Sequence, residues 1–492
     1  MKKTTFVLRA GLACLLVLLI SGTTIYQKST NTPSSPAASQ SWIARASNRK
    51  SAARNPIILV PGLFGTGLVD KDQKVIWGEF ELDSNLLDIA LPLQAQSPVD
   101  ALQPSQILPS LRVNIARWHL EQDSYRQVLE ALNLTQDLPT SQSPQPVSSE
   151  TVGQTVPNLE FAYDWRRDNV KNAQRLQSFI LKKQAELAQQ YPQRYHGDPS
   201  QVKFDIVAHS LGCLLTRYFL RYGDHALGEQ GALPSITWAG GRYVDRVVLV
   251  GPPNGGSLES FVNLAQGESL KELNVFSEPL IALGELVGPW NIGPMTPTNN
   301  LTVLGTFPSM YQMMPRPQYY PIVEPSAIAH SKGADLFDLK VWERWQWGLL
   351  SPTQTDNLQA LLPGVTAAED RYQIAHRYLA HCLNRARRFA LALDQTAQNS
   401  PDVNFELQLV LGDHLPTPQI VNMDTKGKFS IGTTSIGDGV VSLESALLAS
   451  STGQSLRKST TIPWSRIDFY DADHTELIQN AEVFKKITDV RH

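Results

Sequence analysis

Short apolar runs alternate with amphipathic segments through the first half of the chain. Residues 170–191 and 214–222 carry apolar side chains at helical spacing, which predicts two helices. Buried strands are predicted by four short apolar runs, at residues 57–60, 159–165, 202–208 and 244–251. Alternating strands and helices are typical of a mostly parallel sheet with helices on both faces. The pattern therefore predicts an α/β fold.

The pattern changes after residue 256. Residues 257–402 contain no comparable strand, but they have loops rich in proline and asparagine and a long amphipathic helix predicted at 371–393. A strand of the earlier type returns at 405–412. We interpret 56–256 and 403–492 as two parts of one α/β core, and the residues between them as an inserted cap.

Two segments of different character precede the core. Residues 1–26 contain three basic residues followed by an apolar run from Ala10 to Ile20, which is typical of a signal peptide or an N-terminal membrane anchor. Residues 27–55 are rich in Ser, Thr, Pro and Ala, which predicts a disordered linker. The linker has basic residues and no acidic one, which would suit an anionic membrane surface, although a soluble tether is the favoured interpretation. We expect an exported protein, located in a periplasm, a secretory lumen or outside the cell.

Composition narrows the class of protein. The 492 residues are 42% hydrophobic and 18% charged with a net charge of −3, which is typical of a globular protein and excludes a broad basic surface for nucleic acid. Only Cys213 and Cys382 follow the apolar N-terminal run, too few for a disulfide framework. We expect no cofactor and no metal, because the spacing of Asp471, Asp473 and His474 fits no specific metal site. Nothing in the sequence indicates an oligomeric state.

The sequence contains two nearly identical motifs, AHSLG at 208–212 and AHSKG at 329–333. Ser210 follows a predicted strand and precedes a predicted helix, the context of a sharp turn that exposes a nucleophilic serine. Ser331 follows a segment with two prolines inside the predicted cap. We therefore select Ser210 as the nucleophile, with a serine packed at a helix N-terminus as the alternative.

A nucleophilic serine needs a histidine base and an acid that orients it. In this kind of fold the chain order is serine, acid, histidine. Of ten histidines, His474 is best placed, because it follows a predicted strand near the C-terminus, and His414 and His209 are rivals. Asp413 follows a strand directly, whereas Asp438 lies between two glycines before a predicted helix. We prefer Asp438, although spacing alone does not separate the two.

Acyl transfer also needs hydrogen-bond donors for the negatively charged oxygen of the transition state. One predicted donor is the backbone N–H of Leu211, directly after the serine. The other is the N–H of Leu63 in the glycine-rich turn PGLFG that follows the first strand.

The chain carries, in this order, the motifs IILVPGLFGTGL, VIWGEF, YDWR, AHSLG, VGPPNGGS, TFPSMYQMMP and GDGVVSLESAL, followed by a late histidine. Together they resemble the lecithin:cholesterol acyltransferase family, which includes phospholipid:diacylglycerol acyltransferases and lysosomal phospholipase A2. The resemblance extends from Pro56 to Leu477. It implies an α/β-hydrolase fold with a large cap and lid, and it assigns the acid to Asp438. The chain departs from the family in having no cysteine pair near Trp77 and in matching poorly at 83–117, so lid structure and lipid specificity are not carried over.

The resulting hypothesis is serine-dependent acyl transfer on a lipid or phospholipid. Ser210 attacks the ester, His474 accepts its proton, Asp438 stabilises the imidazolium, and the amides of Leu63 and Leu211 hold the oxyanion. Release of the acyl group to water would make the protein a lipase or phospholipase, and release to an alcohol would make it an O-acyltransferase.

Three alternatives remain at this stage. The first is a carboxylesterase or lipase that acts on another ester. The second is a catalytically silent hydrolase-like protein that uses the cap for binding. The third is a cap that mediates protein association through Trp342, Trp345 and Trp347.

Overall fold

A computed structural model describes most of the chain between residues 55 and 484. The described residues are 55–81, 84–94, 101–115, 118–134, 156–267, 297–320, 322–323, 334–396, 404–449, 451–452, 455–456, 462, 464–480 and 483–484. All of them belong to one compact unit, Lys50–His492. The predicted signal segment, nearly all of the predicted linker and Ser331 lie outside the described residues.

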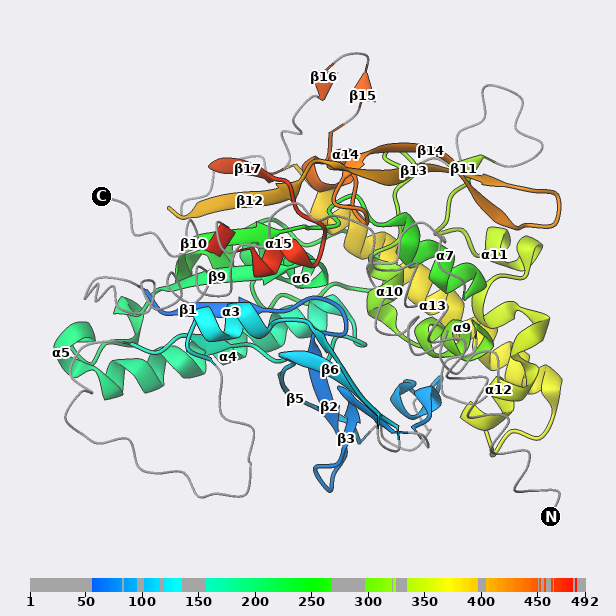
Figure 1. Cartoon of the computed structure of the whole chain (residues 1–492), viewed down its shortest axis with the longest axis horizontal. Coiled ribbons are helices and arrows are strands. Elements are labelled where there is room, and N and C mark those ends of the chain that lie inside the picture. The colour runs from blue at the N-terminus through cyan, green and yellow to red at the C-terminus, as the bar shows by residue number, and fades with distance from the viewer. Residues whose placement is uncertain are drawn as a thin grey trace. The chain divides into compact units, whose positions relative to one another are not determined.

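The core is a sheet of six parallel strands in the order β17-β12-β10-β9-β1-β8. Its strands are β1 (Ile57–Val60), β8 (Leu159–Glu160), β9 (Phe204–His209), β10 (Val244–Val250), β12 (Glu406–Gly412) and β17 (Arg466–Tyr470). Figure 1 labels β1, β9, β10, β12 and β17 as neighbouring arrows, coloured from blue β1 to red β17. Strands β1 and β9 are buried along their whole length, as their apolar sequences predict.

Helices cover both faces of this sheet. Connections between parallel strands are almost always right-handed, so the face on which a helix lies follows from the direction of each crossover. The chain moves from β1 outward to β8, and then back across the sheet through β9 and β10. Helix α3 (Arg126–Ala131), in the first connection, therefore lies on the face opposite α4 (Asn169–Gln190) and α6 (Leu211–Tyr222). Helices α4 and α6 pack together, and α3 packs with α15 (Glu476–Gln479).

Parallel strands, right-handed crossovers and a strand–turn–helix unit at Ser210 make this an α/β-hydrolase fold, which confirms the predicted fold class. Two short helices complete the core, α5 (Pro192–Tyr195) after α4 and α14 (Leu443–Leu447) before the last strand of the sheet.

The described residues between β10 and β12 are mainly helical. Their elements are α7 (Leu258–Gln266), α9 (Pro297–Gly305), α10 (Pro308–Gln312), β11 (Ile322–Val323), α11 (Leu339–Trp345), α12 (Thr355–Leu361) and α13 (Ala368–Asp394). Helix α13 contains the predicted segment 371–393. Figure 1 shows these green and yellow helices together, beside the sheet rather than across it. The limits proposed for the cap stay a prediction.

The C-terminal end of α13 is hydrogen-bonded to side chains of α6. The last backbone carbonyls of a helix have no partner within the helix, so they are free to accept such bonds. Arg217 and Arg221 both donate to the carbonyl of Leu393, at 2.8 and 2.6 Å. Tyr222 donates to the carbonyl of Ala392 at 2.7 Å. The helix that begins at the predicted nucleophile therefore also holds the end of the longest helix in the described part of the chain.

A hairpin that the sequence pattern did not predict lies between β12 and Asp438. Its strands are β13 (Leu415–Met423) and β14 (Phe429–Gly437), and they pair antiparallel. Strand β11 joins β13 in parallel register, so the middle region and the second part of the core share a small sheet. Figure 1 shows the hairpin in orange, extending from the central sheet toward the helices.

Further short strands follow β1 and were also not predicted. They form one sheet of β2 (Thr66–Val69), β3 (Val75–Trp77) and β5 (Gln103–Ile107), and another of β4 (Glu79–Glu81), β6 (Ser110–Ile115) and β7 (Trp118–Asp123). A two-stranded ribbon of β15 (Ser451–Thr452) and β16 (Ser455–Leu456) follows α14. In the part of the chain that the structure describes, no helix is both long and apolar enough to cross a bilayer.

Candidate active site

Ser210 occupies the sharp turn between β9 and α6. Its backbone has φ 52° and ψ −122°, a strained conformation for a residue with a side chain. The Ser210 N–H donates to the carbonyl of Val250 on β10 at 2.9 Å, which ties the start of the turn to the neighbouring strand. Gly212 lies so close to β1 that an added Cβ would be 2.4 Å from the Pro61 carbonyl oxygen. A small residue is therefore required two positions after the serine.

His474 reaches Ser210 from the loop that follows β17. The distance from its Nε2 to the Ser210 Oγ is 2.9 Å, and both side chains are buried. The His474 N–H also donates to the backbone carbonyl of Asp438 at 3.0 Å. Gly251, with φ +57°, lies beside the imidazole, and a Cβ there would be 3.1 Å from two ring atoms. This glycine leaves room for the histidine.

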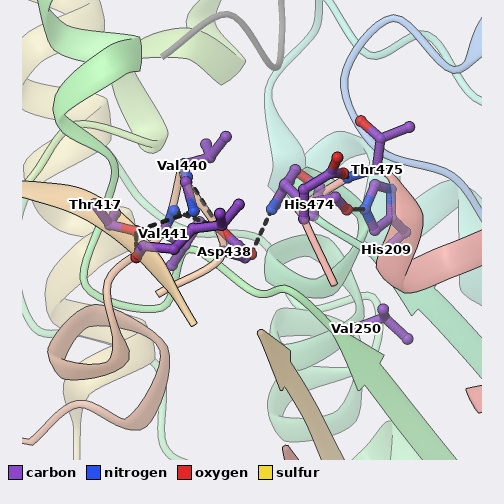
Figure 2. Close-up of polar contacts among 12 residues, drawn as sticks. His209, Val250, Thr417, Asp438, Val440, Val441, His474 and Thr475 are labelled. Carbon is purple, nitrogen blue, oxygen red and sulfur yellow. Dashed lines mark hydrogen bonds and ion pairs between the residues drawn. The ribbon is translucent and has the colours of Figure 1, made fainter. Parts of the chain in front are cut away.

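Asp438 completes the chain of contacts from the end of β14. Its Oδ2 lies 2.7 Å from the His474 Nδ1, and its Oδ1 accepts hydrogen bonds from the N–H groups of Val440 and Val441 at 3.0 and 2.7 Å. Figure 2 shows the carboxylate between these amides and the imidazole. Because the carboxylate accepts at Nδ1, that nitrogen carries the proton and Nε2 is free to accept one from the serine.

The rival residues lie elsewhere. Asp413 and His414 are exposed, and His414 pairs with the surface residue Asp471 at 2.8 Å. His209 is buried but directs its Nε2 to the backbone carbonyl of His474 at 3.0 Å. Within the described ranges, no three His, Cys, Asp or Glu side chains are grouped as a metal site would require. The structure thus brings together the three residues selected from the sequence and separates them from Asp413 and His414.

Leu211 directly follows the serine, and the turn that contains Leu63 packs against it through Gly62. Leu211 is the first residue of α6, so its N–H has no partner within the helix. Leu63 lies in a turn that is closed by a hydrogen bond from the Gly65 N–H to the Gly62 carbonyl at 3.3 Å. An added Cβ on Gly62 would be 2.9 Å from the Ser210 Cβ, so the turn approaches the nucleophile as closely as backbone allows.

Buried aromatic side chains fix the position of this turn by hydrogen bonds to the backbone. Three of them donate to backbone carbonyls in the turn or beside it: Tyr163 to Pro61 at 2.9 Å, Trp77 to Phe64 at 3.0 Å, and Trp165 to Thr66 at 2.9 Å. The Phe64 ring also stacks on Trp77, with a centroid distance of 4.8 Å. The YDWR motif and the tryptophan of VIWGEF are therefore structural supports of the predicted oxyanion turn.

Sequence reasoning missed Tyr125, which lies at the start of α3. Its hydroxyl accepts a hydrogen bond from the Gly62 N–H at 2.7 Å and contacts the His209 Nδ1 at 2.7 Å. Burial, with a smaller contribution from His474, lowers the pKa of His209 to about 3. Nothing near Tyr125 in the sequence signals this role, because its partners are 63 and 84 positions away.

Comparisons with known proteins agree with the motif analysis over part of the chain. The solved structures that align with it include a Tle4–Tli4 complex (13% identity, 89% of this chain and 98% of the other, TM-score 0.46). They also include Bacillus licheniformis lipase BlEst2 in mature form (12%, 89% and 94%, 0.28) and Clostridium botulinum EstA (13%, 90% and 88%, 0.33). No curated protein sequence matches significantly. The family model for lecithin:cholesterol acyltransferase matches residues 153–282, so this segment, which includes Ser210, carries that family's sequence pattern, as its motifs predicted.

Proposed function

We propose that this protein is a serine-dependent enzyme that transfers the acyl group of a lipid ester through an acyl-enzyme. The observation that carries the proposal is the continuous hydrogen-bonded chain from the Ser210 Oγ through His474 to Asp438. Three distant segments meet there, and the residues are only 1%, 2% and 2% exposed. The family match across Ser210 supports an enzyme that acts on esters.

The proposed first half-reaction forms the acyl-enzyme. The Ser210 Oγ attacks the ester carbonyl while its proton passes to the His474 Nε2, and Asp438 stabilises the resulting imidazolium. The carbonyl electrons move onto oxygen, where the amides of Leu63 and Leu211 donate hydrogen bonds. The intermediate then breaks its bond to the alcohol portion, which leaves with the proton from His474.

The second half-reaction returns the serine. His474 removes a proton from an acceptor, which attacks the acyl-enzyme carbonyl. As the bond between the acyl group and the Ser210 Oγ breaks, His474 returns that proton to the serine oxygen. Water as the acceptor gives a lipase or phospholipase reaction, and a lipid alcohol gives O-acyl transfer. The match to an acyltransferase family favours a lipid or phospholipid as the acyl donor.

The nucleophile is tested with a serine-directed fluorophosphonate probe. Wild-type protein should be labelled once per chain, and Ser210→Ala should not be labelled. Ser331→Ala is the matched control, since it removes the serine of the second AHS motif, and it should be labelled like wild type. Full labelling of Ser210→Ala, or none of the wild type, would overturn the assignment.

The acceptor is tested by incubating the protein with phosphatidylcholine vesicles that contain hexadecanol. A fatty ester of hexadecanol would establish acyl transfer, whereas fatty acid as the sole product would restrict the activity to hydrolysis. Hydrolysis of a soluble short-chain ester with no reaction on vesicles would instead support the carboxylesterase alternative.

We further propose that residues 1–26 direct export and either are removed or anchor the protein at a membrane surface. Cell fractionation with N-terminal sequencing tests this proposal. An unprocessed chain found only in the cytosol would contradict it.

A further inference from the structure

Tyr125 and His209 link two parts of the site that come from opposite ends of the chain. On the basis of the proposed function, we infer that both are positioning residues. They fix the oxyanion turn at Gly62 and the backbone of His474 relative to each other. Neither side chain reaches the reacting atoms, so each would act through the group it holds.

The directions of the hydrogen bonds follow from the chemistry of each partner. The His209 Nε2 faces the carbonyl of His474 at 3.0 Å, so this nitrogen must carry a proton. A neutral imidazole then accepts at Nδ1, and the hydroxyl of Tyr125 donates to it at 2.7 Å. The Tyr125 oxygen in turn accepts from the Gly62 N–H at 2.7 Å. Each donor in this chain has one acceptor, so the arrangement has a single consistent orientation.

At one end, the chain of hydrogen bonds fixes the residue before the proposed oxyanion donor. Tyr163 already holds the carbonyl of Pro61 at 2.9 Å. With Tyr125 on the Gly62 N–H, both polar groups of the peptide between Pro61 and Gly62 are held. The orientation of the next N–H, that of Leu63, depends on this peptide. A shift of about 1 Å at such a donor can cost a factor of about 10² in rate.

At the other end, it fixes the proposed base. The His474 N–H binds the carbonyl of Asp438, and the His474 carbonyl binds His209, so both backbone groups of this residue are held. Figure 2 shows His209 and Asp438 on opposite sides of His474. The backbone from which the imidazole reaches the Asp438 carboxylate and the Ser210 Oγ is therefore fixed.

Histidine and tyrosine are suitable at positions 209 and 125, because both side chains stay neutral beside His474, which becomes charged in the proposed mechanism. The rings of His209 and His474 are 5.0 Å apart between centroids. Burial and the nearby His474 lower the pKa of His209 to about 3, so it stays neutral while His474 accepts the serine proton. Burial also raises the pKa of Tyr125, so this hydroxyl keeps the proton that it donates. A cation in place of His209 would oppose the formation of the imidazolium.

The first test removes the hydroxyl alone. Tyr125→Phe should lower kcat for a soluble ester about 10- to 100-fold while KM stays within about threefold, because positioning is lost and ground-state binding is not. Tyr218→Phe is the matched control: it also removes a tyrosine hydroxyl, but this one lies on α6 and donates to the backbone carbonyl of His225 instead of to a residue of the site. Its kcat should stay within about threefold of wild type.

The second test uses His209 and the coupling between the two residues. His209→Phe should lower kcat to a similar extent, and His209→Gln, whose amide can still donate to the His474 carbonyl, should recover about tenfold of that loss. The double variant Tyr125→Phe/His209→Phe should be no slower than the slower single variant, because both changes break one chain of hydrogen bonds.

Folding and function are separated by two measurements on every variant. Thermal unfolding reports folding, and the final extent of fluorophosphonate labelling reports an intact nucleophile. Wild-type kcat in a folded, fully labelled Tyr125→Phe would overturn the inference and leave the proposed function standing, as would multiplicative effects in the double variant. Absence of labelling and of esterase activity in the wild type would instead overturn the proposed function, and the inference with it.

Discussion

At the residue scale, the proposed catalytic side chains are oriented mainly by backbone groups. The Oδ1 of Asp438 is occupied by two amides, so its Oδ2 is left to face His474. Gly251 provides space for the imidazole. Backbone groups in turns cannot rotate away as side chains can, so the geometry exists before any substrate binds.

Replacement of Asp438 by asparagine tests the choice of acid. An amide at this position would donate to the His474 Nδ1 and place the histidine proton on Nε2, where it cannot accept from Ser210. We expect Asp438→Asn to lower kcat about 10³- to 10⁴-fold, as the same kind of change does in a serine protease. Asp413→Asn is the control and should retain activity, since Asp413 is exposed. The reverse result in an ester hydrolysis assay would exchange their roles.

Gly251→Ala tests the space beside the histidine. Its Cβ would lie 3.1 Å from the His474 ring and 3.3 Å from the Asp438 carboxylate, at a backbone φ of +57°. We expect kcat to fall by at least about tenfold, because small displacements of a catalytic group are costly. Gly231→Ala is a matched control, since it also has a positive φ, of +76°, but meets no atom within 4 Å. Equal kcat values for the two variants would show that His474 does not depend on this space.

At the element scale, local patterns predicted the parts of the fold that local sequence determines. The buried run of β9 followed by the amphipathic α6 identified Ser210 correctly as the residue of a strand–turn–helix unit. The hairpin β13–β14 was missed because its first strand contains Pro416 and Pro418, and proline is uncommon inside a sheet. The pairing with β14 becomes irregular directly after Pro418. Its third strand, β11, comes from a distant segment that no local pattern connects to it.

The strand predicted at 159–165 was also only partly right, because local sequence does not reveal contacts with distant residues. Only Leu159–Glu160 is strand, whereas Tyr163 and Trp165 use their polar atoms to hold the turn after β1. Tyr125 and His209 are 84 positions apart in the sequence. Their hydrogen bond could therefore be identified only from the three-dimensional structure. Local context and chain order were enough to select Ser210 and His474, whereas the choice of Asp438 over Asp413 needed the family resemblance.

The contact between α6 and the end of α13 leads to a prediction about stability. Arg217 is buried and donates to the carbonyl of Leu393 and to the Oδ1 of Asn254, both at 2.8 Å. Arg217→Met keeps most of the apolar packing but leaves buried acceptors without this donor, so we expect the free energy of unfolding to fall by about 2–3 kcal/mol. Arg175→Met, at an exposed position of α4, should change it by less than about 0.5 kcal/mol. Urea denaturation measures both, and equal stabilities would contradict the proposed role of Arg217.

At the scale of the whole molecule, segments from both ends of the described chain meet at one point. The turn after β1, the turn at Ser210 after β9 and the loop after β17 meet at a site whose three proposed catalytic side chains are almost fully buried. Burial of a titratable group there makes the stability of the entire fold depend on pH.

His209 should make the protein less stable in acid. Its pKa is about 3 in the folded protein and 6.5 in an exposed chain, so between these values the unfolded state binds the additional proton. Its contribution to stability is complete above about pH 6.5 and declines by up to about 1.4 kcal/mol per pH unit as the pH falls toward 3. In urea unfolding at pH 7, 6, 5 and 4, His209→Gln should therefore show a shallower loss of stability than wild type. His225→Gln, which removes an exposed histidine, is the matched control, and identical slopes for wild type and His209→Gln would refute the prediction.

The backbone of Ser210 has a practical consequence. A conformation with φ 52° and ψ −122° costs about 1–3 kcal/mol for a residue with a side chain, and glycine adopts it without that cost. Under the proposed mechanism, Ser210→Gly would be inert yet more stable than the wild type, with the other residues of the site unchanged. Such a chain would retain an intact ester instead of turning it over, so lipids extracted from the purified glycine variant, compared by mass spectrometry with those from wild type, would identify the natural acyl donor directly.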